Sequence, residues 1–548
     1  MRCFGRRLVV WLSVFLYAAA ADDNSLPTVD LEYEIHQASS FNSTGGYYNF
    51  SNIRYGQAPV GDLRFSAPLP PLTDRSTVQK GDVGTACPQA LPVWYVRGLA
   101  EANCSCDLSS VSDDSFIIPA DPREGEDCLF LDVLVPEKIF AKAGNTSCSG
   151  APVMVWIYGG GYTFGEKANS GSPAGLILRS QQVDETGDGV IYVALNYRGG
   201  AFGFLSGPNL QKNGSANAGL LDQRLALEWV QNYIHLFGGD KNRVTVFGQS
   251  AGGGSVMHQI TAYGGNKGKV PFQQAILQSP GFQPYPGNWQ QDQLLQQYLQ
   301  SMNVSTIQEA RQLPYDTLRK ANTDLVAKSP YGSFTFSPAV DGDFVTGLPG
   351  TLLLHGSFDV SIKVMVGYNA QETLHFVDPA NNDNSAFAAG IKRVFPDIQP
   401  AVVDYITQTL YPEVYDGTYP YTDAKGRAML SDAEASFTCN TYFLDRAFGN
   451  QTYAYRFSIP PAFHGLDVPY TYFNGPDPRV TNETIALAMQ SYITTFAITG
   501  QPNRQDLPEI PLYGENSQIL DLNVTGMAVI SDPEANERCE WWQKALYF

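Results

Sequence analysis

Charged residues are scarce in this sequence of 548 residues, and positive charge is scarcer than negative charge. Charged side chains make up 16% of the chain, and 35 basic residues stand against 54 acidic ones, which gives a formal net charge of −19. A surface this acidic repels phosphate backbones, and no basic run with interleaved aromatic residues is present, so a nucleic-acid partner is excluded. Hydrophobic residues make up 43% of the chain, which indicates a large buried core and excludes a disordered protein.

Long hydrophobic runs are also missing beyond the N-terminus. The first residues combine three arginines with the apolar run Leu8–Tyr17 and the small residues Ala18–Ala21. This run is too short to cross a bilayer, and the pattern is typical of a secretory signal peptide over residues 1–21, with a retained membrane anchor as the alternative. Later segments never approach about 18 uninterrupted apolar residues, so we expect a secreted protein without a transmembrane segment.

The sequence contains few cysteines, and we expect them to be paired as in a secreted protein. The seven that follow the signal peptide are Cys87, Cys104, Cys106, Cys128, Cys148, Cys439 and Cys539. An oxidising compartment pairs most of them, and their odd number leaves one without an intrachain partner. Nine glycosylation sequons are spread along the chain, at Asn42, Asn49, Asn103, Asn145, Asn213, Asn303, Asn450, Asn482 and Asn523.

No internal repeat or low-complexity linker divides the chain, and short apolar strands alternate with helix-like segments. Predicted strands occupy Val153–Tyr158, Val190–Leu195, Val244–Phe247, Ala275–Gln278, Lys363–Val366 and Tyr453–Phe457. The spacing of Leu221–Phe237 predicts a helix that Gly238 and Gly239 end. This alternation is typical of an α/β fold with a mostly parallel central sheet flanked by helices. We therefore expect residues 22–548 to form a single domain.

A Gly-x-Ser-x-Gly motif, Gly248-Gln249-Ser250-Ala251-Gly252, stands where a predicted strand meets a predicted helix. Such a motif is weak evidence alone, because it occurs by chance in glycine-rich loops. In a strand–turn–helix context, the sharp turn projects the serine outward and requires glycine two residues before and after it. Ser250 is therefore the predicted nucleophile.

Three consecutive glycines, Gly159-Gly160-Gly161, directly follow the predicted strand Val153–Tyr158. Acyl transfer needs backbone N–H donors aimed at the developing oxyanion, and glycines let the main chain approach closely. We assign an oxyanion hole to Gly160, Gly161 and the N–H of Ala251; an ordinary turn is the alternative. Tyr162 and Gln249, next to these donors and to the serine, are the candidate substrate-binding residues.

The general base must be one of six histidines. In hydrolases with this elbow the acid follows the serine and the histidine comes last, which favours His464, in a loop after the strand Tyr453–Phe457. His375 leaves little room for an acid between itself and Ser250. Glu372, which follows the strand Lys363–Val366, is the predicted acid. Asp341 and Asp343 are the runner-up acids, although they resemble turn residues.

Several further segments carry a resemblance to a known family. They are Glu126–Val133, Asn196–Arg198, Phe202–Leu205, Asn217–Leu227 and Phe237–Asp240. Together with the elbow, they are similar to the type-B carboxylesterase, lipase and cholinesterase family of α/β-hydrolases over nearly all of residues 22–548. The signal peptide and the sequons resemble those of secreted fungal members.

The resemblance implies Ser250, Glu372 and His464 as a catalytic triad and the same oxyanion hole. It also implies the disulfides Cys87–Cys128 and Cys439–Cys539, and it leaves the pairing among Cys104, Cys106 and Cys148 open. Two departures matter: Gln249 replaces the family's glutamate before the serine, which argues against cationic substrates, and Thr373 replaces the glycine after the acid.

The loop between Cys87 and Cys128 carries an apolar patch of Leu91, Val93, Trp94 and Tyr95. This patch either forms a lid, as in lipases, or simply packs on the rim of the site.

These residues predict a hydrolase of neutral carboxylic esters that needs no cofactor or metal. The alternatives are a pathway-specific esterase, lactonase or acyltransferase of natural-product metabolism, and a non-catalytic cholinesterase-like binding protein. The intact triad argues against the binding protein.

Overall fold

The computed structural model describes residues 26–82, 84–104, 108, 110–144, 149–285 and 287–547. The predicted signal peptide lies outside these residues, as do Asn145, Cys106, Cys148 and the side chains of Asn103 and Cys104. None of the helices in the described ranges has the length and apolar character needed to cross a membrane.

An 11-stranded sheet forms the centre of the molecule, in the spatial order β14-β13-β12-β11-β10-β9-β7-β8-β6-β4-β3. Its strands are β3 (Ser40–Asn42), β4 (Tyr47–Arg54), β6 (Phe130–Pro136), β7 (Ala151–Ile157), β8 (Ile191–Leu195), β9 (Gly239–Gln249), β10 (Gln274–Gln278), β11 (Lys363–Asn369), β12 (Tyr453–Phe457), β13 (Gln518–Asn523) and β14 (Gly526–Ser531). All neighbours from β8 to β13 are parallel, and the pairs nearer the edges are antiparallel. A small second sheet joins β1 (Thr28–Asp30), β2 (Ile35–Gln37) and β5 (Val78–Gln79).

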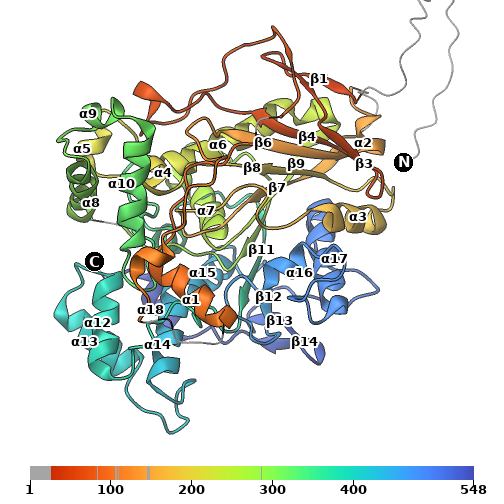
Figure 1. Cartoon of the computed structure of the whole chain (residues 1–548). Helices are drawn as coiled ribbons and strands as arrows, with labels where there is room; N and C mark the ends of the chain where they lie inside the picture. Colours follow the sequence, from red (N-terminus) through yellow and green to blue (C-terminus); the bar gives the residue numbers. More distant parts are fainter. Residues whose placement is uncertain are drawn as a thin grey trace, which may run out of the picture.

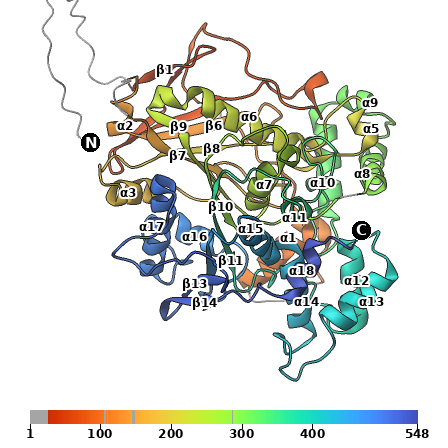
Figure 2. The same cartoon turned by 180° about the vertical axis from the view of Figure 1, so that it is seen from behind.

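Helices cover both faces of the central sheet (Figure 1). One group contains α3 (Ala174–Val183), α16 (Asp467–Thr471) and α17 (Glu483–Thr499), and the other contains α6 (Ala218–Tyr233), α7 (Ala251–Ile260) and α15 (Cys439–Ala447). The peripheral helices are α1 (Val93–Cys104), α2 (Glu137–Phe140), α4 (Gly200–Phe204), α5 (Pro208–Gln211), α8 (Asn288–Ser301), α9 (Ile307–Arg311), α10 (Tyr315–Ala327), α11 (Pro349–Leu354), α12 (Asn384–Val394), α13 (Pro400–Tyr405), α14 (Ala424–Ala433) and α18 (Glu537–Gln543). Helices α3 and α17 are far apart in sequence yet pack side by side, as both views show (Figures 1 and 2).

The sequence predicted every strand from β7 to β12, with errors only at the ends. Val244–Phe247 is the buried part of the longer β9, and Lys363–Val366 continues to Asn369 in β11. The helix predicted at Leu221–Phe237 begins earlier, at Ala218, and its last turn is a 3₁₀ segment, Ile234–Phe237. The α/β class is therefore confirmed, while the single domain over residues 22–548 stays a prediction.

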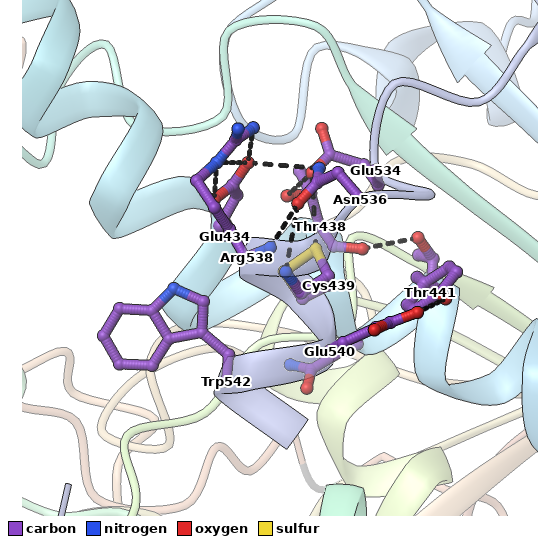
Figure 3. The surroundings of a disulfide bond; sticks show 12 residues. Glu434, Thr438, Cys439, Thr441, Glu534, Asn536, Arg538, Glu540 and Trp542 are labelled. Carbon is purple, nitrogen blue, oxygen red and sulfur yellow. Dashed lines mark hydrogen bonds and ion pairs between the residues drawn. A yellow bond between two sulfur atoms is a disulfide. The ribbon is translucent and has the colours of Figure 1, made fainter. Parts of the chain in front are cut away.

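Two disulfide bonds, Cys87–Cys128 and Cys439–Cys539, lie among the described residues. The second joins the start of α15 to α18, 100 residues further along the chain. Figure 3 shows it beside the ion pair of Glu434 and Arg538, whose carboxylate and guanidinium atoms are 2.5 Å apart. Since Phe437 lies two residues before Cys439, this crosslink anchors a segment that reaches the candidate site.

Candidate active site

Ser250 stands at the sharp turn between β9 and α7, with φ 59° and ψ −126°, a backbone conformation that L-residues rarely adopt. The flanking glycines are needed because a Cβ on Gly252 would lie 2.0 Å from the Ile157 carbonyl oxygen, and one on Gly248 would lie 2.7 Å from the same oxygen. The Ser250 N–H donates to the Gln278 carbonyl at 3.0 Å, which ties the turn to the end of β10. The strained turn thus has the geometry of a nucleophile elbow.

His464 and Glu372 approach each other from two loops that follow neighbouring parallel strands. Glu372 comes after β11 and His464 after β12, so both lie at the carboxyl edge of the sheet, as Ser250 does after β9. His464 Nδ1 is 2.5 Å from Glu372 Oε2, and the Glu372 side chain is fully buried. A buried carboxylate at this distance fixes the imidazole orientation and stabilises its charged form.

Two polar groups that the sequence did not reveal hold the Glu372 carboxylate. Ser279 Oγ and the Asn369 N–H both donate to Glu372 Oε1, each at 2.6 Å. Ser279 directly follows β10, the strand between β9 and β11, and this place at the carboxyl edge was the only signal that could have identified it. With one oxygen held by these donors, the other is directed to His464.

His464 also contacts residues that belong to the Ser250 cavity. Its ring centroid is 4.4 Å from that of Phe437 and 5.4 Å from that of Phe376, and both phenylalanines line the cavity that contains Ser250. Gln249 Nε2 is 3.3 Å from His464 Nε2. When His464 Nδ1 donates to Glu372, Nε2 carries a lone pair, and the Gln249 amide donates to it. The same lone pair is the one that a general base uses.

This contact leads to a prediction for Gln249→Glu. A carboxylate beside Nε2 stabilises the imidazolium, and only the neutral imidazole accepts a proton. We therefore expect the acidic limb of the kcat/KM profile to move to higher pH, with near wild-type rates on the alkaline side. Gln249→Met removes the amide donor but adds no charge, so it should move the limb much less than Gln249→Glu does. A limb that stays in place in Gln249→Glu, or moves to lower pH, would contradict this role.

The glycine loop after β7 brings unused backbone donors to the same cavity. Gly160 and Gly161 have φ 123° and 58°, and a Cβ would lie 2.1 Å from the Phe164 carbonyl oxygen at Gly160 and 2.3 Å from the Phe334 ring at Gly161. Within the described ranges, neither of these two N–H groups has a hydrogen-bond acceptor. Gly161 lines the cavity together with Ser250 and Ala251. These N–H groups are therefore available to an oxyanion.

The cavity is narrow and mostly aromatic. Its volume is about 60 Å³. Its aromatic walls come from Tyr162, Phe282, Tyr331, Phe334, Phe336, Phe376, Phe387 and Phe437. Tyr162, which we singled out for substrate binding, is 2% exposed, and its hydroxyl donates to the Gly281 carbonyl at 3.4 Å. A cavity of this shape suits a small ester.

The apolar patch of the Cys87–Cys128 loop packs on this aromatic wall. Trp94 of α1 has its ring centroid 5.0 Å from Tyr331, 5.5 Å from Phe334 and 5.7 Å from Phe376. Its indole N–H donates to the Ser333 carbonyl at 2.9 Å. Helix α1 therefore covers one wall of the cavity, and a lid function for the loop stays a prediction.

The rival residues lie in other surroundings. The ring of His375 packs against Phe463 at 5.0 Å, and burial together with Lys425 lowers its pKa. Asp341 accepts from the Asn217 side-chain amide at 2.7 Å and from two backbone N–H groups of its own turn. Asp343 is exposed and pairs with Lys267. No bond that we find among the described residues joins any of the three to His464.

Thr373 follows the acid at a position where the family usually has glycine, and the backbone accommodates it without strain. Among the described residues, those with positive φ do not include Thr373, so glycine is not required. The Thr373 hydroxyl donates to the Met429 carbonyl at 2.6 Å, and the residue is 1% exposed. The substitution therefore adds a bond to α14 without straining the acid loop.

The parallel sheet, the serine elbow and the acid–histidine pair define an α/β-hydrolase. The chain belongs to the carboxylesterase family, whose sequence model matches residues 36–542. Its relatives include carboxylesterase patB of Aspergillus clavatus, 42% identical with 97% of this chain and 98% of the relative covered, and carboxylesterase patB of Penicillium expansum, 41% identical with 98% of each covered. The crystal structure of Aspergillus niger EstA matches with a TM-score of 0.79 at 25% identity, covering 95% of this chain and 98% of that one. The protein is thus an enzyme of the carboxylesterase type.

Proposed function

We propose that the protein is a secreted serine hydrolase that cleaves neutral carboxylic esters through an acyl-enzyme on Ser250. The observation that carries the proposal is the His464–Glu372 pair, 2.5 Å apart, beside a cavity that contains a strained serine. Ser250 Oγ attacks the ester carbonyl while its proton passes to His464 Nε2. His464 then gives this proton to the leaving alcohol, and a water that it activates releases the acid.

The glycine loop supplies the electrostatic part of this mechanism. The carbonyl oxygen becomes negative in the tetrahedral intermediate, where the N–H groups of Gly160, Gly161 and Ala251 donate to it. Removing one such donor typically lowers kcat by about 10²–10³-fold, so the loop carries a large share of the rate. Gln249, a neutral residue beside the base, favours neutral esters over cationic ones.

Export is part of the proposal. A signal peptide over residues 1–21, two disulfides and a set of sequons are all suited to an oxidising secretory compartment. Two of the sequon asparagines, Asn213 and Asn303, are exposed, which makes them the best placed of the described ones for a glycan. Proteins of Arthroderma benhamiae and Botryotinia fuckeliana called secreted lipases are 30% and 28% identical to this chain.

A series of aryl esters with increasing acyl length, assayed below and above their solubility limit, tests the substrate class. Because the cavity is narrow, we expect kcat/KM to peak on short, soluble esters and to show no jump above the solubility limit. A rate that rises on emulsified long-chain esters would contradict this and favour a lid-gated lipase.

A second candidate is a pathway-specific esterase, lactonase or acyltransferase. The narrow cavity and the full-length similarity to the two patB carboxylesterases favour a dedicated small substrate. Esterase and acyltransferase differ in what attacks the acyl-enzyme. Product analysis separates them: hydrolysis gives only the free acid, whereas acyl transfer gives a new ester when an acceptor alcohol is added.

A further inference from the structure

Four polar residues around Arg393, which we call the polar wall, are among those that line the aromatic cavity: Asp378, Asn381, Arg393 and Asp432. Arg393 belongs to α12 and Asp432 to α14, while Asp378 and Asn381 precede α12. Figures 1 and 2 show α12 and α14 at the periphery, apart from α7, whose first turn carries the elbow. None of these four residues belongs to the triad or to the oxyanion hole, so ester cleavage itself assigns them no role.

Asn381 in this wall has an unsatisfied amide. The residue is 7% exposed, and its Oδ1 is buried without a hydrogen-bond partner. An unpaired buried amide destabilises a protein, so such groups are rare without a binding role or a bound molecule. A Cβ placed on Gly390 would lie 3.5 Å from Asn381 Nδ2 and 3.6 Å from Arg393 Nη2, which puts both side chains beside the same residue of α12.

Asp432 offers a second acceptor to the same space. Its carboxyl has neither a hydrogen bond nor an ion pair with any residue in the described ranges. Burial raises the pKa of Asp432 to about 7, and Arg393 acts against this rise. Arg393 itself pairs with Asp378, with the guanidinium and carboxylate atoms 3.6 Å apart. The wall thus combines free acceptors with a guanidinium that is already partly neutralised.

We propose that the cavity binds an ester that carries a free hydroxyl group away from the scissile bond, and that Asn381 and Asp432 recognise this hydroxyl. The inference rests on the proposed esterase function and names its substrate class. A hydroxyl both donates and accepts, so it satisfies Asn381 in either orientation of the amide and Asp432 in either protonation state. A saturated hydrocarbon chain satisfies neither.

Charged substituents fit this wall less well than a hydroxyl. An ammonium group would meet the positive charge of the Arg393 guanidinium. A carboxylate would meet Asp378 and Asp432. A neutral hydroxyl makes the same hydrogen bonds without either repulsion.

Matched pairs of esters test the proposal on both sides of the scissile bond. The acyl pair is an aryl butanoate and the aryl 3-hydroxybutanoate, which cannot readily form a lactone; the alcohol pair is butyl acetate and the monoacetate of butane-1,4-diol. In at least one pair we expect kcat/KM to be about tenfold higher for the hydroxylated ester, as for one or two added hydrogen bonds. Asn381→Leu and Asp432→Leu should each bring this ratio close to one, because neither leucine can hydrogen-bond to the hydroxyl.

Asn382→Leu makes the same chemical change at the adjacent, exposed position and should keep the wild-type ratio. Asp432→Asn, which still accepts a hydrogen bond and alters the shape little, should keep most of the preference.

Equal rates on both members of both pairs, or a preference that survives in Asn381→Leu and Asp432→Leu, would overturn the proposal while leaving esterase function in place. A wild-type preference for an amino-substituted ester that disappears in Asp432→Asn would overturn it in favour of a cationic substrate. Failure of the wild type to hydrolyse even the plain esters would instead refute the proposed esterase function.

Discussion

Replacing Ser250 by alanine is expected to lower kcat on a soluble aryl ester by at least about 10⁴-fold without unfolding the protein. The hydroxyl is the only group that the alanine removes, and Ser250 makes its structural bonds through the backbone, to Gln278 and Gly281. The substitution replaces the hydroxymethyl side chain by a methyl group, so it removes the nucleophile and keeps the sharp turn. Steady-state kinetics give the loss, and circular dichroism with a thermal melt reports the fold.

Ser436→Ala is the matched control, because Ser436 lines the same cavity. It should keep kcat within about threefold of the wild type, as expected of a substitution that leaves the reacting groups untouched. Wild-type turnover by Ser250→Ala would show that another residue is the nucleophile.

Replacing Glu372 by glutamine is expected to lower kcat by about 10³–10⁴-fold. The carboxylate accepts a hydrogen bond from His464 Nδ1 on one oxygen, and hydrogen bonds from Ser279 Oγ and the Asn369 N–H on the other. Glutamine presents one oxygen and one NH₂ group, so either the two donors or His464 Nδ1 must face an amide that cannot accept. The imidazole then loses its orientation, and the imidazolium that forms during turnover loses a buried counter-charge.

Asp341→Asn separates this acid from the runner-up. Asp341 accepts hydrogen bonds within its own turn, so its loss should affect stability but leave kcat nearly unchanged. A large fall in kcat in Asp341→Asn together with normal turnover in Glu372→Gln would reverse the assignment.

The sequence predicted the parts of the site that follow from local sequence patterns. Ser250, Glu372 and His464 each follow a strand that was recognisable from its apolar residues, and parallel strands end at the same edge of a sheet. Chain order and strand ends therefore sufficed to propose a pairing of Glu372 with His464 across 92 residues. The glycines of the elbow and of the loop after β7 were also readable, because the backbone there leaves no space for a side chain.

The rest depends on contacts between distant segments. Ser279 gains its importance only when β10 lies between β9 and β11. Phe437 contacts His464 only because the segment Glu434–Thr438, which joins α14 to α15, packs against the site. No sequence pattern identifies Asn381 and Asp432, which come together only as lining residues of one cavity. The disulfide partners likewise came from family resemblance, since spacing alone leaves many pairings open.

Labelling with a fluorophosphonate probe, followed by peptide mass spectrometry, tests directly whether Ser250 is the nucleophile, because the probe reacts with activated serines whatever the natural ester is. We expect one stoichiometric adduct on the peptide that contains Ser250, lost in Ser250→Ala and formed much more slowly in Glu372→Gln. Absence of labelling at Ser250 in the folded wild-type protein, or an adduct on a different serine, would contradict it.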